Sequence, residues 1–193
     1  MYAKKILFAL LLLSPALLQA QDAELSQQEI EDLLGVKIRF ATHMAFNPAV
    51  IRAVEQQNDQ SLTLTEIKKR DEIWKNAGDK PNALIREITN NDVAKYFQRR
   101  VENNSAIDEV FLTDINGANV AAYPPTSDYW QGDEEKFTLS FNEGNGKVFI
   151  GPLELDESTK KTQVQISAPI IEDEKTIGVL ILGVSVDYLK TKQ

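Results

Sequence analysis

The sequence contains no cysteine and only one histidine, and each scarcity removes a class of chemistry. Without cysteine, the chain forms no disulfide bond and offers no cysteine for a lipid anchor. His43 falls in a helical pattern beside Met44. A catalytic base needs an orienting partner and a substrate cleft, so we interpret it as a structural or surface residue. The sequence also lacks a G-x-S-x-G elbow, a glycine-rich phosphate loop and an H-E-x-x-H motif, and it therefore predicts a protein that is not an enzyme.

Positive charge is also scarce, with 21 Lys and Arg against 29 Asp and Glu and a formal charge of −8. Such a surface repels phosphate backbones, which excludes nucleic acid as a partner. Two short stretches, the three acids at 133–135 and Asp-Ile-Asn-Gly at 114–117, have residue types that bind metals, but neither has the alternating ligands of a calcium loop. A helix first turn and a β-turn account for them, so we predict neither a metal nor a cofactor.

The N-terminal apolar run, residues 6–18, is too short to span a bilayer, which needs about 20 residues. Lys4 and Lys5 precede it, and Gln19-Ala20 offers a cleavage site ahead of Gln21. This pattern predicts a signal peptide over 1–20 and an exported, periplasmic chain of 21–193, with an uncleaved anchor as the alternative. Removal of the signal takes away two lysines and no acids, which changes the charge from −8 to −10.

The first half of the mature chain, about 24–104, has helical periodicity. A capping box at 26–29 begins a long amphipathic helix that reaches Met44. The Asn47-Pro48 pair interrupts it and starts a continuation over 49–57. A second capping box at 63–66 begins a helix that Gly78 ends, and another helix is predicted over 92–102.

The second half, about 107–189, has the period of two that is typical of strands. We predict strands over 107–114, 119–123, 147–151, 162–170 and 176–186, with Asn116-Gly117 as a hairpin turn. The last strand is apolar on both faces, which places it in the middle of the sheet. Helices followed by strands indicate one α+β domain, a five-stranded antiparallel sheet with the helices on one face.

Residues 124–137, PPTSDYWQGDEEKF, join the second and third strands, and we call them the lid segment. The segment is too rich in aromatic and acidic side chains for a simple connection. Tyr129 and Trp130 combine broad apolar rings with polar tips, so the lid segment could close over a ligand. Alternatively, Tyr129, Trp130 and Phe137 could only seal the core beneath it, because pockets and core covers are both lined by aromatic residues.

The order of motifs resembles the Cache family of extracytoplasmic sensor domains, which have a PAS-like fold. The resemblance covers about 107–189 and rests on VFLTDINGANVAAYP, TSDYWQGDEEKF, VFIGPLELDEST and VQISAPIIEDEKTIGVLILGVSVDYL. It implies a stand-alone, single Cache domain that binds a polar solute of the amine, amino-acid or carboxylate class. Because no apolar run follows Leu189, we expect it to signal through a membrane-bound receptor or sensor kinase.

By position, the resemblance implies a pocket bordered by side chains from the strands, the lid segment and the stretch before the fourth strand: Phe111, Thr113, Tyr123, Asp128, Tyr129, Trp130, Phe149, Asp156, Ser158, Gln165 and Ser167. Lys136 falls where the amino-acid-binding branch has an arginine, and lysine is a poorer bidentate partner for a carboxylate. Two acids, Asp128 and Asp156, favour a ligand with an amine. The alternative function is a structural or interaction module whose pocket is filled by the lid aromatics.

Overall fold

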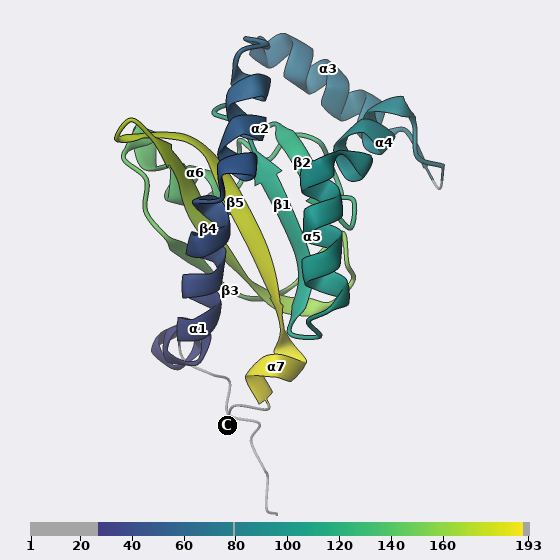
Figure 1. The fold of residues 1–193 in the computed structure, drawn as a ribbon. Coiled ribbons are helices and arrows are strands. Elements are labelled where there is room, and N and C mark those ends of the chain that lie inside the picture. The colour runs from purple at the N-terminus through teal and green to yellow at the C-terminus, as the bar shows by residue number, and fades with distance from the viewer. Residues whose placement is uncertain (1–26, 79, 191–193) are drawn as a thin grey trace, which may run out of the picture.

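The computed structural model describes residues 27–78 and 80–190, which form an antiparallel sheet with helices packed against it (Figure 1). The strands are β1 (Ile107–Thr113), β2 (Asn119–Tyr123), β3 (Phe149–Leu155), β4 (Thr162–Glu172) and β5 (Lys175–Ser185), in the order β2-β1-β5-β4-β3. The predicted α+β, PAS-like fold with a five-stranded sheet is confirmed, and β5 is its central strand. The predicted signal peptide and the first residue of the 26–29 capping box lie outside the described residues.

Three helices cover one face of the sheet: α1 (Gln27–Ala45), α2 (Pro48–Asn58) and α5 (Asp92–Glu102). Figure 1 shows them crossing in front of the strands. Their apolar side chains pack with those of β1, β4 and β5 in one large core cluster. Val164, Ile166 and Ala168 point into this cluster, as the alternation along β4 predicts.

The opposite face carries a second core cluster, to which α3 (Leu64–Lys75), α4 (Ala83–Asn90) and α6 (Glu135–Phe141) contribute. The sequence analysis placed the helices on one face only. The structure has them on both, because Phe111, Val179 and Ile181 are apolar on this second face and also need cover. The sequence analysis did not predict α4, the short 3-10 helix η1 (Asn142–Gly144) or α7 (Val186–Lys190).

Side-chain caps fix where the helices begin. Glu66 N donates to Thr63 Oγ1 (3.3 Å) and Thr63 N donates to Glu66 Oε2 (2.8 Å), which confirms the predicted capping box of α3. Asn47 Oδ1 accepts from Ala49 N at 2.9 Å, and Pro48 opens α2 as predicted. The α3 cap matters for the functional site, because α3 carries Asp71, whose carboxylate accepts a hydrogen bond from the backbone of the lid segment.

The turn between β1 and β2 brings the lid segment close to the sheet. Gly117 has φ +80°, as the hairpin signal predicts. Gln131 N donates to Gly117 O at 2.8 Å, and a Cβ on Gly117 would lie 2.5 Å from Gly132 Cα. Gly117 therefore provides both a left-handed turn and the space in which the lid segment passes.

We expect Gly117→Ala to lower the free energy of unfolding by roughly 3 kcal/mol, from backbone strain together with the clash against Gly132. Gly144→Ala is the matched control, because Gly144 has φ +87° and nothing within 4 Å of its added Cβ. It should cost about 1 kcal/mol from strain alone. Urea unfolding measures both, and equal losses would show that the approach of Gly132 carries no energy.

Candidate functional site

Polar side chains gather on the second face of the sheet, next to α6 and the β3–β4 turn. Glu109 on β1 and Gln163, Gln165 and Ser167 on β4 are all buried there. They alternate with the apolar residues that face α1, so the pleat of the strands puts all four on this face. A buried polar group needs a partner, and these four point to a site rather than to a simple core.

Glu109 is the one acid among these four residues, and only 1% of its surface is exposed. Its Oε1 accepts from Gln163 Nε2 (2.5 Å) and Gln165 Nε2 (2.8 Å), and Ser158 Oγ lies 3.0 Å from its Oε2. Burial, followed by repulsion from Asp156, raises the pKa of Glu109, although the three hydrogen bonds oppose the shift. The group is therefore easier to protonate than an exposed glutamate.

Asp156 shapes the turn after β3. Its Oδ1 accepts from Ser158 N (3.0 Å), Ser158 Oγ (2.6 Å), Thr159 N (2.7 Å) and Thr159 Oγ1 (2.9 Å). Burial would raise the pKa of Asp156, but these bonds and the charge of Lys136 outweigh it and lower the pKa. Its Oδ2 lies 3.3 Å from Gln165 Nε2, so this oxygen faces the polar group on the sheet.

Lys136, in the first turn of α6, reaches toward the same place. Its Nζ lies 2.9 Å from Glu134 Oε2 and 5.6 Å from the centre of the Phe111 ring, and only 17% of its side chain is exposed. Burial would lower the pKa of Lys136, but Glu134, Glu109 and Asp156 outweigh it and raise the pKa. The side chain is therefore held as a cation among carboxylates.

Two clefts flank this lysine. The first, which we call the acidic cleft, has a volume of about 420 Å³ and lies between the lid segment and the end of β3. Six of its lining residues are acids: Asp128, Asp133, Glu134, Glu154, Asp156 and Glu157. The second, the inner cleft, has a volume of about 260 Å³ and includes Phe149 and Gln165. Both clefts share Glu134, Lys136 and Glu154, so they adjoin at Lys136, and we call the two together the groove.

Asp128 connects the lid segment to the acidic cleft. Its side chain is 17% exposed, accepts from Gln131 Nε2, and lies 3.6 Å from Lys75 Nζ. Burial raises the pKa of Asp128 to about 6, assisted by repulsion from Glu134 and Asp71 and opposed by Lys75 and Lys136. This shift makes Asp128 a carboxyl whose charge is costly unless a cation joins it.

The lid aromatics mainly seal the core. Tyr129 is fully buried, with its ring centre 6.0 Å from that of Trp74, and its hydroxyl accepts from Gln57 Nε2 at 3.1 Å. Asp71 Oδ1 accepts from Tyr129 N (2.9 Å) and Trp130 N (3.2 Å), while Trp130 Nε1 donates to Asn116 O at 2.9 Å. Tyr129 and Trp130 thus anchor the lid segment and leave its acidic part beside the groove.

The structure brings together some of the residues that the resemblance implied. Asp128 and Asp156 line the acidic cleft, Phe149 and Gln165 line the inner cleft, and Ser158 bridges to Glu109. Other side chains lie elsewhere or are already engaged, as three cases show. Thr113 Oγ1 donates to Val179 O (3.2 Å), Tyr123 packs on the opposite face and donates to Glu102 Oε1 (2.9 Å), and the Tyr129 hydroxyl accepts from Gln57 Nε2 (3.1 Å). Ser167 Oγ does lie on the face of the site, where it is buried without a hydrogen-bond partner.

Sequence reasoning missed Glu109 as a site residue, and it noted Lys136 only as a weak substitute for a ligand-binding arginine, without including it among the pocket residues. The alternation Glu109, Phe111, Thr113 was the available signal for the first, since it puts an acid on the same face as two residues named for the pocket. For Lys136 no periodic signal exists, because its position depends on how the lid segment folds back. Glu134 and Glu154 were missed for the same reason.

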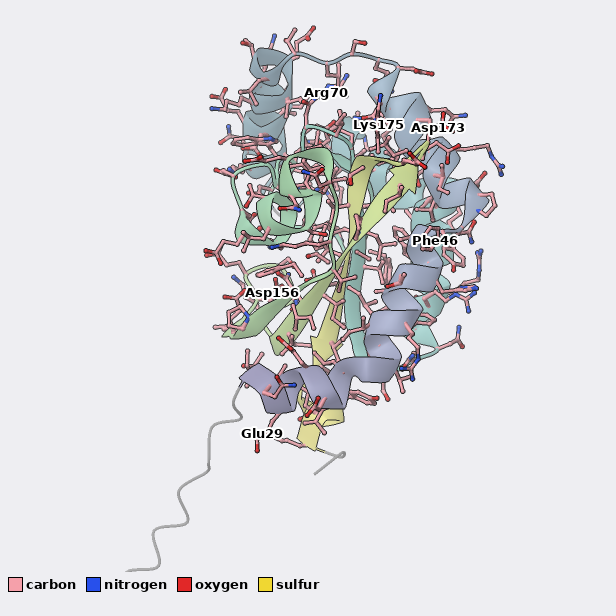
Figure 2. The ribbon with its side chains drawn as sticks, turned by 90° about the vertical axis from the view of Figure 1, so that its left-hand side faces the viewer. Glu29, Phe46, Arg70, Asp156, Asp173 and Lys175 are labelled. Atoms are coloured by element: carbon pink, nitrogen blue, oxygen red, sulfur yellow. The ribbon has the colours of Figure 1, made fainter. Side chains whose placement is uncertain are left out.

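A further cleft, of about 410 Å³, lies between α2 and the α4–α5 corner. It is lined by Arg52, Gln56, Gln60 and Asn91 among others, and includes none of the side chains that the resemblance implied. We favour the groove at Lys136 as the functional site, because buried charges from four separate segments converge there. Figure 2 shows Asp156 and Phe46 on opposite sides of the sheet. The groove, which Asp156 lines, therefore lies on the side away from Phe46.

Neither a metal centre nor a membrane span is found in the described part of the chain. Within 27–78 and 80–190, no three His, Cys, Asp or Glu side chains are placed to hold a metal ion. No helix in these residues has the length and apolarity needed to cross a bilayer.

No family model matches the sequence, and no curated protein matches it. Similar solved structures do exist. The sensor domain of Escherichia coli DcuS is 14% identical, with a TM-score of 0.49 over 86% of this chain and 97% of that one. The sensory domain of the Campylobacter jejuni chemoreceptor Tlp3 with isoleucine bound is 17% identical, with a TM-score of 0.42 over 87% of this chain and 67% of that one. The sensor domain of the V. cholerae histidine kinase DctB is 15% identical, with a TM-score of 0.39 over 75% and 59%. All three are sensor domains.

Asp128 should make stability depend on pH. Its pKa is about 6 in the folded chain against 3.8 for the ordinary group, so the folded state binds more protons between these values. The contribution of Asp128 to the free energy of unfolding therefore falls by an amount on the order of 2 kcal/mol as pH rises from about 4 to 6. Above about pH 6 it stays low. Asp128→Asn should remove this fall.

Urea unfolding of the wild type and Asp128→Asn between about pH 3.5 and 7.5 measures the difference. The variant should gain stability relative to the wild type as pH rises through the window. A difference that stays constant across the pH range would show that Asp128 titrates like an exposed aspartate.

Proposed function

We propose that this chain is a Cache-type sensor domain that binds a small polar solute carrying a protonated amine. The observation that carries the proposal is the convergence of Asp128 and Asp156 on one acidic cleft beside Lys136. Its volume of about 420 Å³ is in the range of small-molecule sites. A donor-rich cation suits these walls, because six carboxylates surround a single lysine.

The electrostatics of the cleft support a cationic ligand over a simple anion. The raised pKa of Asp128 means that its charge is destabilised in the empty groove, and a ligand ammonium would relieve that cost. Asp156 has one oxygen committed to its own turn and the other turned toward Gln165, so Oδ2 is the atom that would meet the ligand. A zwitterionic amino acid would use Lys136 for its carboxylate.

A binding role is favoured over catalysis. His43, the one histidine, is exposed on α1 and lies across the sheet from the groove. The lining of the groove consists mainly of carboxyl, amide and ammonium groups, which suit the binding of a polar solute.

The proposal includes export and a partner. The sequence pattern of residues 1–20 supports secretion to the periplasm, where a sensor of extracellular solutes would work. A membrane-bound receptor or sensor kinase would carry the signal onward.

The alternative function, an interaction module with a filled pocket, is favoured by one observation. Tyr129 and Phe137 are core residues, with 0% and 6% of their surface exposed, so the lid segment does fill part of the space above the sheet. A module of this kind would bind no small solute, and a ligand screen separates the two functions.

A thermal-shift screen of amines, amino acids, organic acids and purines on residues 21–193 tests the proposal. We expect an amine to raise the unfolding midpoint. No shift with any compound would favour the interaction module.

With the best hit, Asp128→Asn and Asp156→Asn should each weaken binding by about 2 kcal/mol, or roughly 30-fold, because each removes a charge that the ligand needs. Asparagine keeps an oxygen acceptor for the turn bonds of Asp156, so the fold should persist. Isothermal titration calorimetry measures the three affinities.

Asp173→Asn is the matched control, because Asp173 is exposed in the β4–β5 turn, far from Asp156 in Figure 2. It removes one charge without touching the groove and should leave affinity unchanged. Equal affinities for all four proteins would remove both carboxylates from the site.

Export has its own test. Expression of the full chain in a Gram-negative host should give a protein in the periplasmic fraction whose first residue is Gln21. N-terminal sequencing identifies the cleavage point. Recovery of the intact N-terminus in the membrane fraction would instead support the uncleaved anchor.

A further inference from the structure

The position of Lys136 is unusual for a lysine on a surface helix. Lysine side chains are rarely buried unless they are paired, and this one keeps only 17% of its surface exposed. Its ammonium group lies over the Phe111 ring at 5.6 Å, within the range of a cation–π contact. Glu134 Oε2 lies 2.9 Å from it, Asp156 lines the same acidic cleft, and the charges of Glu134, Glu109 and Asp156 raise the pKa of Lys136.

An aromatic face with surrounding carboxylates is the arrangement by which proteins bind ammonium groups of ligands. Here the group that fills the arrangement belongs to the chain itself. We propose that Lys136 is the built-in occupant of an organic-ammonium site, and that a ligand's ammonium group replaces it there when the groove is filled. This proposal deepens the proposed function, on which its second half rests.

The groove gives the exchange a structural consequence. Lys136 stands between the acidic cleft and the inner cleft and lines both. When its side chain leaves, the two clefts join above Phe111. Because Lys136 belongs to the first turn of α6, its exchange for a free ligand would release one contact between α6 and β1, the one from Lys136 to Phe111.

Lys136 is tethered to the site because it is part of the chain, and this tether determines how well a free amine can compete with its ammonium group. An ammonium group attached to the site has a high effective concentration, which a free amine has to exceed. A simple amine should therefore bind poorly to the wild type, and much better once the lysine side chain is cut back. The ligand that opens the wild-type groove needs further contacts, such as those with Asp128 and Asp156 Oδ2.

Lys136→Ala removes three carbons and the ammonium group beyond Cβ, and n-propylamine supplies three carbons and an amine. In the presence of n-propylammonium chloride, we expect a saturable rise of about 3 °C in the unfolding midpoint of Lys136→Ala, and a much smaller one in the wild type. Two controls isolate the charge. 1-Propanol has the same shape without the ammonium, and sodium chloride matches the ionic strength; neither should produce the rise.

Lys68→Ala is the matched variant, because Lys68 Nζ lies 5.1 Å from the Trp130 ring but on an exposed side chain. It should show no rise with the amine. If Lys136→Ala does not fold in buffer, its refolding yield by circular dichroism replaces the midpoint. n-Propylamine should then recover the fold and 1-propanol should not.

The outcomes separate this inference from the proposed function. Equal effects of amine and alcohol on Lys136→Ala, or equal effects of the amine on both lysine variants, would overturn the ammonium site. An amine-specific rescue of Lys136→Ala alone supports the site even if the wild type binds nothing in the screen. A wild-type ligand that depends on Asp128 and Asp156, without rescue of Lys136→Ala, would support the proposed function and overturn this inference.

Discussion

The burial of β5 on both faces is the constraint on which the rest of the structure depends. Its residues from 178 to 185 are all buried, and it pairs with β1 on one side and β4 on the other. A strand of this kind needs apolar cover above and below, because its side chains alternate between the two faces. The helices on both sides follow from this need, and so does the return of the lid segment across the second face.

The cover on the second face divides into an apolar part and a polar part. Tyr129 and Trp74 close the apolar part, next to α3 and α4, and Asp71 holds the backbone of the lid segment in place. The polar part, next to α6, contains the charged groups of Glu109 and Lys136, and the ammonium of Lys136 lies over the Phe111 ring. The lid segment therefore has two roles: one end completes the core, and the other end forms the wall of a groove.

Local signals predicted most of the fold. The capping box at Thr63 and the Asn116-Gly117 turn depend on neighbouring residues, so they are readable in the sequence. The groove is different, because its charges come from segments far apart in the chain and meet only through tertiary packing. Tyr123 illustrates the limit: it was named for the pocket, yet it pairs with Val110 and shares that residue's face. Strand register, which sequence alone leaves open, decides such cases.

The position of β5 as the last strand also determines the order in which the sheet can close. β1 pairs with β2, and β3 pairs with β4, but β1 and β4 never meet; β5 alone joins them. β5 follows β4 through the short turn at 173–174, so its pairing with β4 is local, whereas its pairing with β1 joins two parts of the sheet that are distant in the sequence. The pairing of Ile107 with Val184 spans most of the strand region, so closure needs long-range contacts. Folding of this domain is therefore expected to be slow for its size, because the two halves of the sheet join only through this long-range pairing.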